Sequence, residues 1–475
     1  MTRSSAPRPA VSRAPHLVAA PAASRTAPLL LAGLLLTSAC GTATQEGAGP
    51  AAATADRLAA GQQAQHTNGH VHSEGSAAVE AVAASTTAPP APGAAPEQAA
   101  DPAVALRSEL ERLLGAHVLL ADEVVRGQLL GRDDVARASS ASVGRNTDEL
   151  VEAVTSLAGA PTGQQFRTTW EGHVEVLTQY ATALEKDDKA GQQAARDAYG
   201  KAEAELATAL SAVVGGKVPQ ADLTAATTAH GRHLLEQADA YAAKDYPKAA
   251  SIQRDAFAHM IVMADVLARG VAAAKGLPTT ELDTPRRDLH SALSRLLAEH
   301  MGLMVQVLRA TQDEAPDLAA AGEALNANTA DIGAAIGTLF GADASRQFLE
   351  LWAAHIEGLI DVARNADDPA AQQAGREAQQ QYAPQLARFL ATATEERLPA
   401  IDLAAALTVH DDHLLDMVDA YAAEDYEESQ QQADAGYAHM MELAGVLAVA
   451  IGQTQAAKLP QGGAATGGGG TAGRS

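Results

Sequence analysis

An internal duplication is the feature that most constrains what this chain can fold into. Residues 223–267 and 403–447 have closely similar sequences, with the motifs DAYAAKDY and DAYAAEDY at equivalent positions. Matched residues lie 180 apart here and 182 to 183 apart further toward the N-terminus, so only a few inserted residues separate the copies. Such a chain is expected to form two similar units or, if the repeats stack, one continuous solenoid.

The duplicated stretch keeps histidines at equivalent positions. Ten of the 15 histidines fall into five matched pairs. The pairs are His117 with His300, His173 with His355, His230 with His410, His233 with His413, and His259 with His439. Within each copy the first three are spaced 55 to 57 residues apart, which indicates three related helical hairpins with a histidine at the same level in each.

Helical periodicity runs through both copies. Apolar residues recur at helical spacing, and the 47% hydrophobic content contains only 3% aromatic residues, with Ala and Leu dominant. Small side chains of this kind favour closely packed helices. We therefore predict an all-α fold, a tandem duplication of a six-helix bundle made of three hairpins. The expected bundles are 102–275 and 286–458, followed by a disordered tail at 459–475.

The N-terminus has the pattern of an export signal. Residues 1–26 carry arginines and no acidic residue, and a short apolar run then leads to Cys40, the single cysteine. A basic segment, an apolar run and small residues before a cleavage site are typical of a secretory signal. Leu36–Cys40 resembles the lipobox of bacterial lipoproteins, which implies a signal peptide at 1–39, a lipid on Cys40 and a position on the outer face of the cytoplasmic membrane. The alternative is an ordinary signal peptide with a chance cysteine.

Residues 40–101 are rich in Ala, Gly, Thr and Pro, which predicts a disordered tether. It contains His66, His70 and His72, which could bind a metal weakly or could simply be uncharged polar residues of the linker.

Charge and motifs narrow the range of functions. A net charge of −24 disfavours nucleic acid as a partner, because an acidic surface repels phosphates. The sequence contains no nucleophile elbow, phosphate loop or dinucleotide fingerprint. No Glu-x-x-His pair of the kind that di-iron bundles use is repeated in the two copies. We therefore expect a protein that is not an enzyme; its protein partners cannot be read from the sequence.

The matched histidines predict a metal site in each copy. They lie on apolar helix faces, and clustered neutral imidazoles are good ligands for copper or zinc. The predicted ligands are His117, His173, His230 and His259 in the first copy, and His300, His355, His410 and His439 in the second. His233 and His413 are expected in a supporting or alternate role. The rival hypothesis is a helical interaction scaffold without metal, whose histidines are hydrogen-bonded core residues.

Two resemblances accompany this interpretation. The lipobox region, together with the Ala, Arg and Gly bias, is similar to that of lipoproteins from high-GC Gram-positive bacteria. The duplicated segment, with its WxxH, HxxHLL and AHM phrases, resembles uncharacterised exported helical proteins of Gram-positive bacteria. The second resemblance covers roughly 102–458 and implies no activity and no site residues.

Overall fold

The computed structural model describes residues 101–458, and this part of the chain is all-α, as predicted. It contains twelve α-helices and one short 3-10 helix, with no strand among the described residues. The first six helices are α3 (Pro102–Leu129), α4 (Asp133–Ala158), α5 (Ala160–Glu185), α6 (Lys189–Val213), α7 (Gln220–Ala242) and α8 (Tyr246–Lys275). After η3 (Thr280–Asp283) come α9 (Pro285–Gln312), α10 (Leu318–Phe340), α11 (Ala342–Arg364), α12 (Pro369–Ala393), α13 (Ala400–Ala422) and α14 (Tyr426–Lys458). We call α3–α8 the first half and α9–α14 the second half.

Several predicted features lie outside the described residues. They are the signal peptide at 1–39, the lipidated Cys40, all but the last residue of the tether with His66, His70 and His72, and the tail at 459–475.

The helix ends follow from local side-chain chemistry. Asp101 accepts a hydrogen bond from the Ala103 amide at 2.9 Å, and Pro102 occupies the first helical position, where its missing N–H costs nothing. Asp425 caps α14 by accepting from the Glu428 amide at 3.1 Å. Asp425 and Glu428 do not form a reciprocal capping box, because the Glu428 carboxylate accepts from Gln432 and the Asp425 amide donates to the Ala420 carbonyl.

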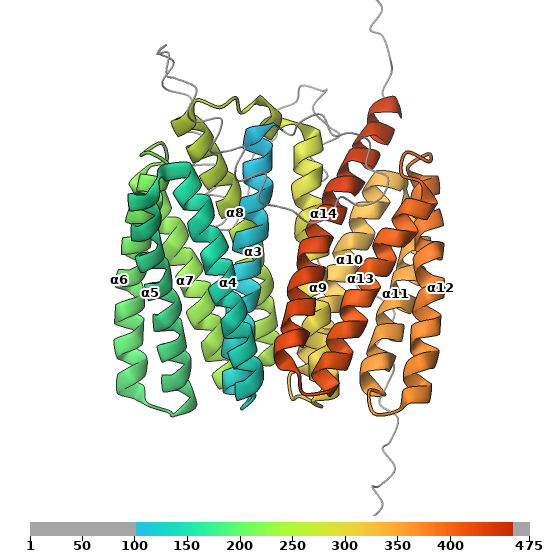
Figure 1. The fold of residues 1–475 in the computed structure, drawn as a ribbon, viewed down its shortest axis with the longest axis horizontal. Coiled ribbons are helices and arrows are strands. Elements are labelled where there is room, and N and C mark those ends of the chain that lie inside the picture. Colours follow the sequence, from blue (N-terminus) through green and yellow to red (C-terminus); the bar gives the residue numbers. More distant parts are fainter. Residues whose placement is uncertain (1–100, 459–475) are drawn as a thin grey trace, which may run out of the picture.

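Each half is closed by its first and last helices. In the first half α3 packs along both α4 and α8, and in the second α9 packs along both α10 and α14. The halves meet through α4 against α14, α8 against α10, and α3 against α9. Figure 1 shows α3, α9 and α14 near the middle of the molecule, with α5 and α6 at one side and α11 and α12 at the other.

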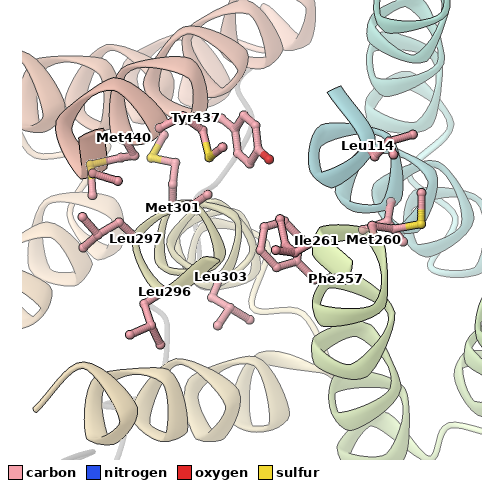
Figure 2. Packing of buried hydrophobic residues seen from close by; sticks show 14 of the residues in the cluster. Leu114, Phe257, Met260, Ile261, Leu296, Leu297, Met301, Leu303, Tyr437 and Met440 are labelled. Atoms are coloured by element: carbon pink, nitrogen blue, oxygen red, sulfur yellow. The ribbon is translucent and has the colours of Figure 1, made fainter. Parts of the chain in front are cut away.

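One hydrophobic core runs through both halves. A single cluster of buried side chains extends from Leu106 in α3 to Ile451 in α14. Figure 2 shows part of it, where Met301, Leu297 and Leu303 of α9 lie among side chains of neighbouring helices. α8 and α14 are apolar and long enough to cross a membrane by length and composition, but more than half of each apolar window is buried inside the bundle, as in the core helices of soluble proteins.

Buried ion pairs also join the halves. Arg126 Nε lies 2.6 Å from Asp317 Oδ2, and Arg309 Nη1 lies 3.0 Å from Glu123 Oε2. All four side chains are almost fully buried. Removing one partner of such a pair leaves an uncompensated charge in the core, so these pairs tie the two halves to one relative position.

Candidate metal centres

Three histidines of the first half converge in its interior. His117 comes from α3, His173 from α5 and His230 from α7, which are the first helices of the three hairpins. One ring nitrogen from each lies within 4.8 Å of the others, and all three side chains are buried. The Nε2 atoms of His117 and His173 are 3.2 Å apart. We call this group the first triad.

The second half contains the equivalent group. His300 of α9, His355 of α11 and His410 of α13 bring one nitrogen each within 4.8 Å of the others, again fully buried. The ring centroids are 5.4 to 6.0 Å apart. We call this group the second triad.

Aromatic side chains hold the rings from one side. Trp170, one turn before His173 on α5, places its ring 4.6 Å from His117 and 4.7 Å from His173, measured between centroids. Phe166 stacks behind Trp170 at 5.2 Å. Trp352 and Phe348 repeat the arrangement beside His300. The spacing Phe-x3-Trp-x2-His puts all three side chains on one helix face, so each tryptophan packs beside the histidine of its own helix and beside that of α3 or α9.

The buried ring nitrogens are poorly satisfied by the protein. Both nitrogens of His230, His300 and His410 lack a hydrogen-bond partner within residues 101–458, as does Nδ1 of His117, and Nδ1 of His173 has no partner of good hydrogen-bond geometry. Burial lowers the pKa of His117, His230, His300 and His410 well below the usual range, and lowers that of His173 to about 4. The imidazoles are therefore neutral at physiological pH, which leaves lone pairs free to bind a cation.

The fourth predicted ligand of each half lies outside the triad. His259 Nε2 donates to the Ala226 carbonyl at 3.0 Å, and His439 Nε2 donates to the Ala406 carbonyl at 2.8 Å. His259 packs against the ring of His233 at 5.6 Å between centroids, and His439 against that of His413 at 6.3 Å. These four side chains are only partly buried, so they form a separate, outer pair in each half.

The methionines that follow His259 and His439 belong to the hydrophobic core. Met260 and Met440 are both buried in the main cluster, and Figure 2 draws them among its side chains. Their placement agrees with the expectation that adjacent positions on a helix point about 100° apart.

The second triad has a carboxylate and an amide beside it that the sequence analysis did not select. Asp411 Oδ1 lies 3.2 Å from His355 Nδ1, and Gln379 Oε1 lies 3.3 Å from the same atom. His355 Nδ1 is hydrogen-bonded to Gln379 Oε1, whereas Asp411 Oδ1 is close to the same atom without hydrogen-bond geometry, and His355 Nε2 has no partner in the described chain. Ligand histidines commonly hold their second ring nitrogen in this way. Asp411 directly follows His410, and this adjacency was the only available signal.

The first triad has a different neighbourhood. Tyr199 of α6 stands edge-on to His173 at 6.3 Å between centroids, and Glu203, one turn later, is 2% exposed. Neither oxygen of Glu203 has a partner of good hydrogen-bond geometry among the described residues. Burial raises the pKa of Glu203 to about 8.

Comparison with protein-family models, with curated proteins and with solved structures finds no match to this chain.

Proposed function

We propose that this chain binds a transition metal, copper or zinc, through buried histidines, with one site in each half. The observation that carries the proposal is the convergence of three buried imidazoles in each half, with one nitrogen of each within 4.8 Å of the others. A metal at the centre of such a group accepts nitrogen ligands at roughly 2.0–2.1 Å, which small movements of the rings would provide.

The competing role, a metal-free scaffold with hydrogen-bonded core histidines, fits the triads less well. A buried polar atom without a partner costs roughly 1–3 kcal/mol, and each triad has several such nitrogens. A bound metal would offset part of this cost, because it takes one lone pair from each ring. The outer histidines His259 and His439 fit the scaffold role better, since both are bonded to backbone carbonyls.

The proposal includes origin and location. The two halves are read as a duplicated six-helix unit, because their triads come from equivalent helices.

A lipid on Cys40 would hold the folded halves at the outer face of the cytoplasmic membrane. Changing Cys40 to Ser should then release the protein from the membrane fraction or leave the precursor uncleaved, and unchanged membrane fractionation would contradict the anchor.

The metal site is tested by titrating the purified, metal-free protein with Zn²⁺ and Cu²⁺ against a chromophoric competitor. We expect two tight equivalents in the wild type, one after His117→Ala or His300→Ala, and none after both changes. His259→Ala and His439→Ala are matched controls, which should keep two equivalents. A variant with His66, His70 and His72 changed to Ala should also keep both.

Two results would overturn the proposal. One is tight binding that survives the double His117→Ala, His300→Ala change. The other is the absence of tight binding in the wild type, which would favour the scaffold.

A further inference from the structure

The two halves differ at the residue that directly follows the triad histidine of α7 or α13. This residue is Gly231 in the first half and Asp411, which has a buried carboxylate, in the second, 180 residues apart. Asp411 directs its side chain toward the triad and reaches 3.2 Å from His355. Gly231 has no side chain, so the first half must fill the same space from elsewhere.

Glu203 and Tyr199 of α6 fill that space. A Cβ added to Gly231 would lie 3.0 Å from Glu203 Cγ and 2.5 Å from Tyr199 Cε1. Both contacts are tighter than ordinary packing allows. The side chain of Glu203 therefore occupies, from a different helix, the space beside α7 that the Asp411 side chain takes beside α13.

The corresponding positions on α12 show the reciprocal change. Arg196 of α6 and Arg376 of α12 fix the alignment, because they bond the matched residues Asp239 and Asp419. In this alignment Glu203 corresponds to Ala383, a residue without a carboxylate. The tyrosine moves as well: Tyr199 corresponds to Gln379, and Tyr382, which corresponds to Ala202, stacks on His355 at 4.5 Å between centroids.

Each half thus has one buried carboxylate beside the residue position that follows its α7 or α13 triad histidine, and one tyrosine against a triad ring, although neither comes from an equivalent position. The first half uses Tyr199, Ala202, Glu203 and Gly231, and the second uses Gln379, Tyr382, Ala383 and Asp411. A buried carboxylate is costly unless a positive charge or hydrogen bonds compensate it. Its presence in both halves by different routes points to a positive charge that belongs in the centre.

We propose that this carboxylate, Glu203 in the first half and Asp411 in the second, offsets the charge of a metal held by the histidine triad, and that the centre therefore takes a divalent cation. The inference rests on the proposed metal binding. Three neutral imidazoles would leave a buried dication with its full double charge, and one carboxylate halves the net charge of the site. A monovalent cuprous ion needs this compensation less. Imidazole ligands suit both Zn²⁺ and Cu²⁺.

The experiment compares Glu203→Gln and Asp411→Asn with the wild-type full chain in competition titrations with Zn²⁺ and with Cu⁺. The matched controls are Glu205→Gln and Asp412→Asn, which remove the same charge from exposed neighbouring positions. We expect each site variant to weaken Zn²⁺ binding at one of the two sites by about 10–100-fold, the range typical of groups that support metal ligands. Cu⁺ binding should weaken less, and the controls should bind as the wild type does.

Thermal unfolding of the metal-free proteins separates a metal role from a structural one. Glu203→Gln removes a buried carboxylate without a good partner, so the metal-free variant should unfold at a temperature no lower than the wild type. A variant that loses stability and affinity together would indicate a packing role and overturn the inference for that half.

A transplant provides the second test. The first half receives the second half's set through Tyr199→Gln, Ala202→Tyr, Glu203→Ala and Gly231→Asp. Its Zn²⁺ affinity should exceed that of Glu203→Ala alone by about tenfold or more. If the wild type binds two Zn²⁺ while the site variants bind with unchanged affinity, the carboxylate proposal is wrong and the histidine proposal stands. If the wild type binds no metal, both are wrong.

Discussion

A buried imidazole on an apolar helix face can be read from sequence, but its partners cannot. The duplication selected the six triad histidines, because a matched spacing of 55 to 57 residues places them at one level of three hairpins. The same signal also selected His259 and His439, which bond backbone carbonyls instead. Glu203 and Asp411 escaped it, because each lacks a carboxylate at its matched position. Comparison of the two copies finds residues that occupy matched positions, and it misses residues that are present in only one copy.

The buried histidines make the stability of the metal-free protein depend on pH. The pKa of His173 is about 4 in the folded chain, because burial disfavours its charged form, and about 6.5 in an unfolded chain. Between these values the unfolded state binds more protons. The contribution is therefore fully present above pH 6.5 and is lost as the pH falls toward 4.

We expect the free energy of unfolding of the metal-free wild type to decrease from pH 6.5 to pH 5, measured by urea denaturation followed by circular dichroism. In His173→Gln the slope should be smaller by up to about 1.4 kcal/mol per pH unit, the value for one proton. Comparing slopes cancels the opposite contributions of Glu203 and Asp122, whose pKa values burial raises. Equal slopes in the two proteins would contradict the assignment.

At the scale of elements, helices and their ends were the most predictable part of the structure. Turn-forming residues near Gly131, Gly159 and Lys186–Asp188 lie where α3, α4 and α5 end. Periodicity and turn residues carry this information locally. The backbone conformation of the α7–α8 and α13–α14 turns was harder to predict from the sequence. Lys244 (φ 61°) and Glu424 (φ 60°) take a left-handed conformation there that usually favours glycine.

These two turns can be improved by glycine. The amides of Lys244 and Asp245 donate to the carbonyls of Tyr241 and Ala240, which closes α7 with a left-handed residue at position 244. A side chain there costs roughly 1–2 kcal/mol. Lys244→Gly should therefore raise the free energy of unfolding by up to about 1 kcal/mol, measured by chemical denaturation. Ala243→Gly is the matched control. Its φ of −78° is ordinary, so glycine should lower stability there by about 0.5–1 kcal/mol. Equal effects at the two positions would count against this account.

At the scale of the whole molecule, the contact between the halves was not predictable from one sequence. Periodicity shows that a helix has a buried face but not which helix covers it. The single core and the ion pairs between the halves appear only when α4 meets α14 and α8 meets α10.

Breaking the Arg126–Asp317 pair should lower the free energy of unfolding far more than breaking a surface pair. Asp317→Ala leaves the buried Arg126 with Glu123, 3.9 Å away, as its remaining ion-pair partner, so we expect a loss at the lower end of about 3–5 kcal/mol in the free energy of unfolding. Asp343→Ala breaks the exposed pair with Arg346 and should cost less than about 1 kcal/mol. Urea denaturation of both variants at pH 7 measures the difference. Similar small losses in both would mean that the buried pair does not hold the halves together.

The ion pairs at the junction between the halves are not symmetric. Arg126 and Arg309 occupy equivalent positions, 183 residues apart, yet Arg126 pairs with Asp317 and Arg309 with Glu123. Asp317 precedes α10 at the cap position that Arg132 holds before α4, after linkers of unequal length at 313–317 and 130–132. Arg126 therefore meets a residue at the N-terminal end of α10, whereas its counterpart Arg309 meets a residue within α3. The two buried ion pairs are not equivalent under exchange of the halves, so each half presents a different surface to the other and the contact is that of two unlike partners.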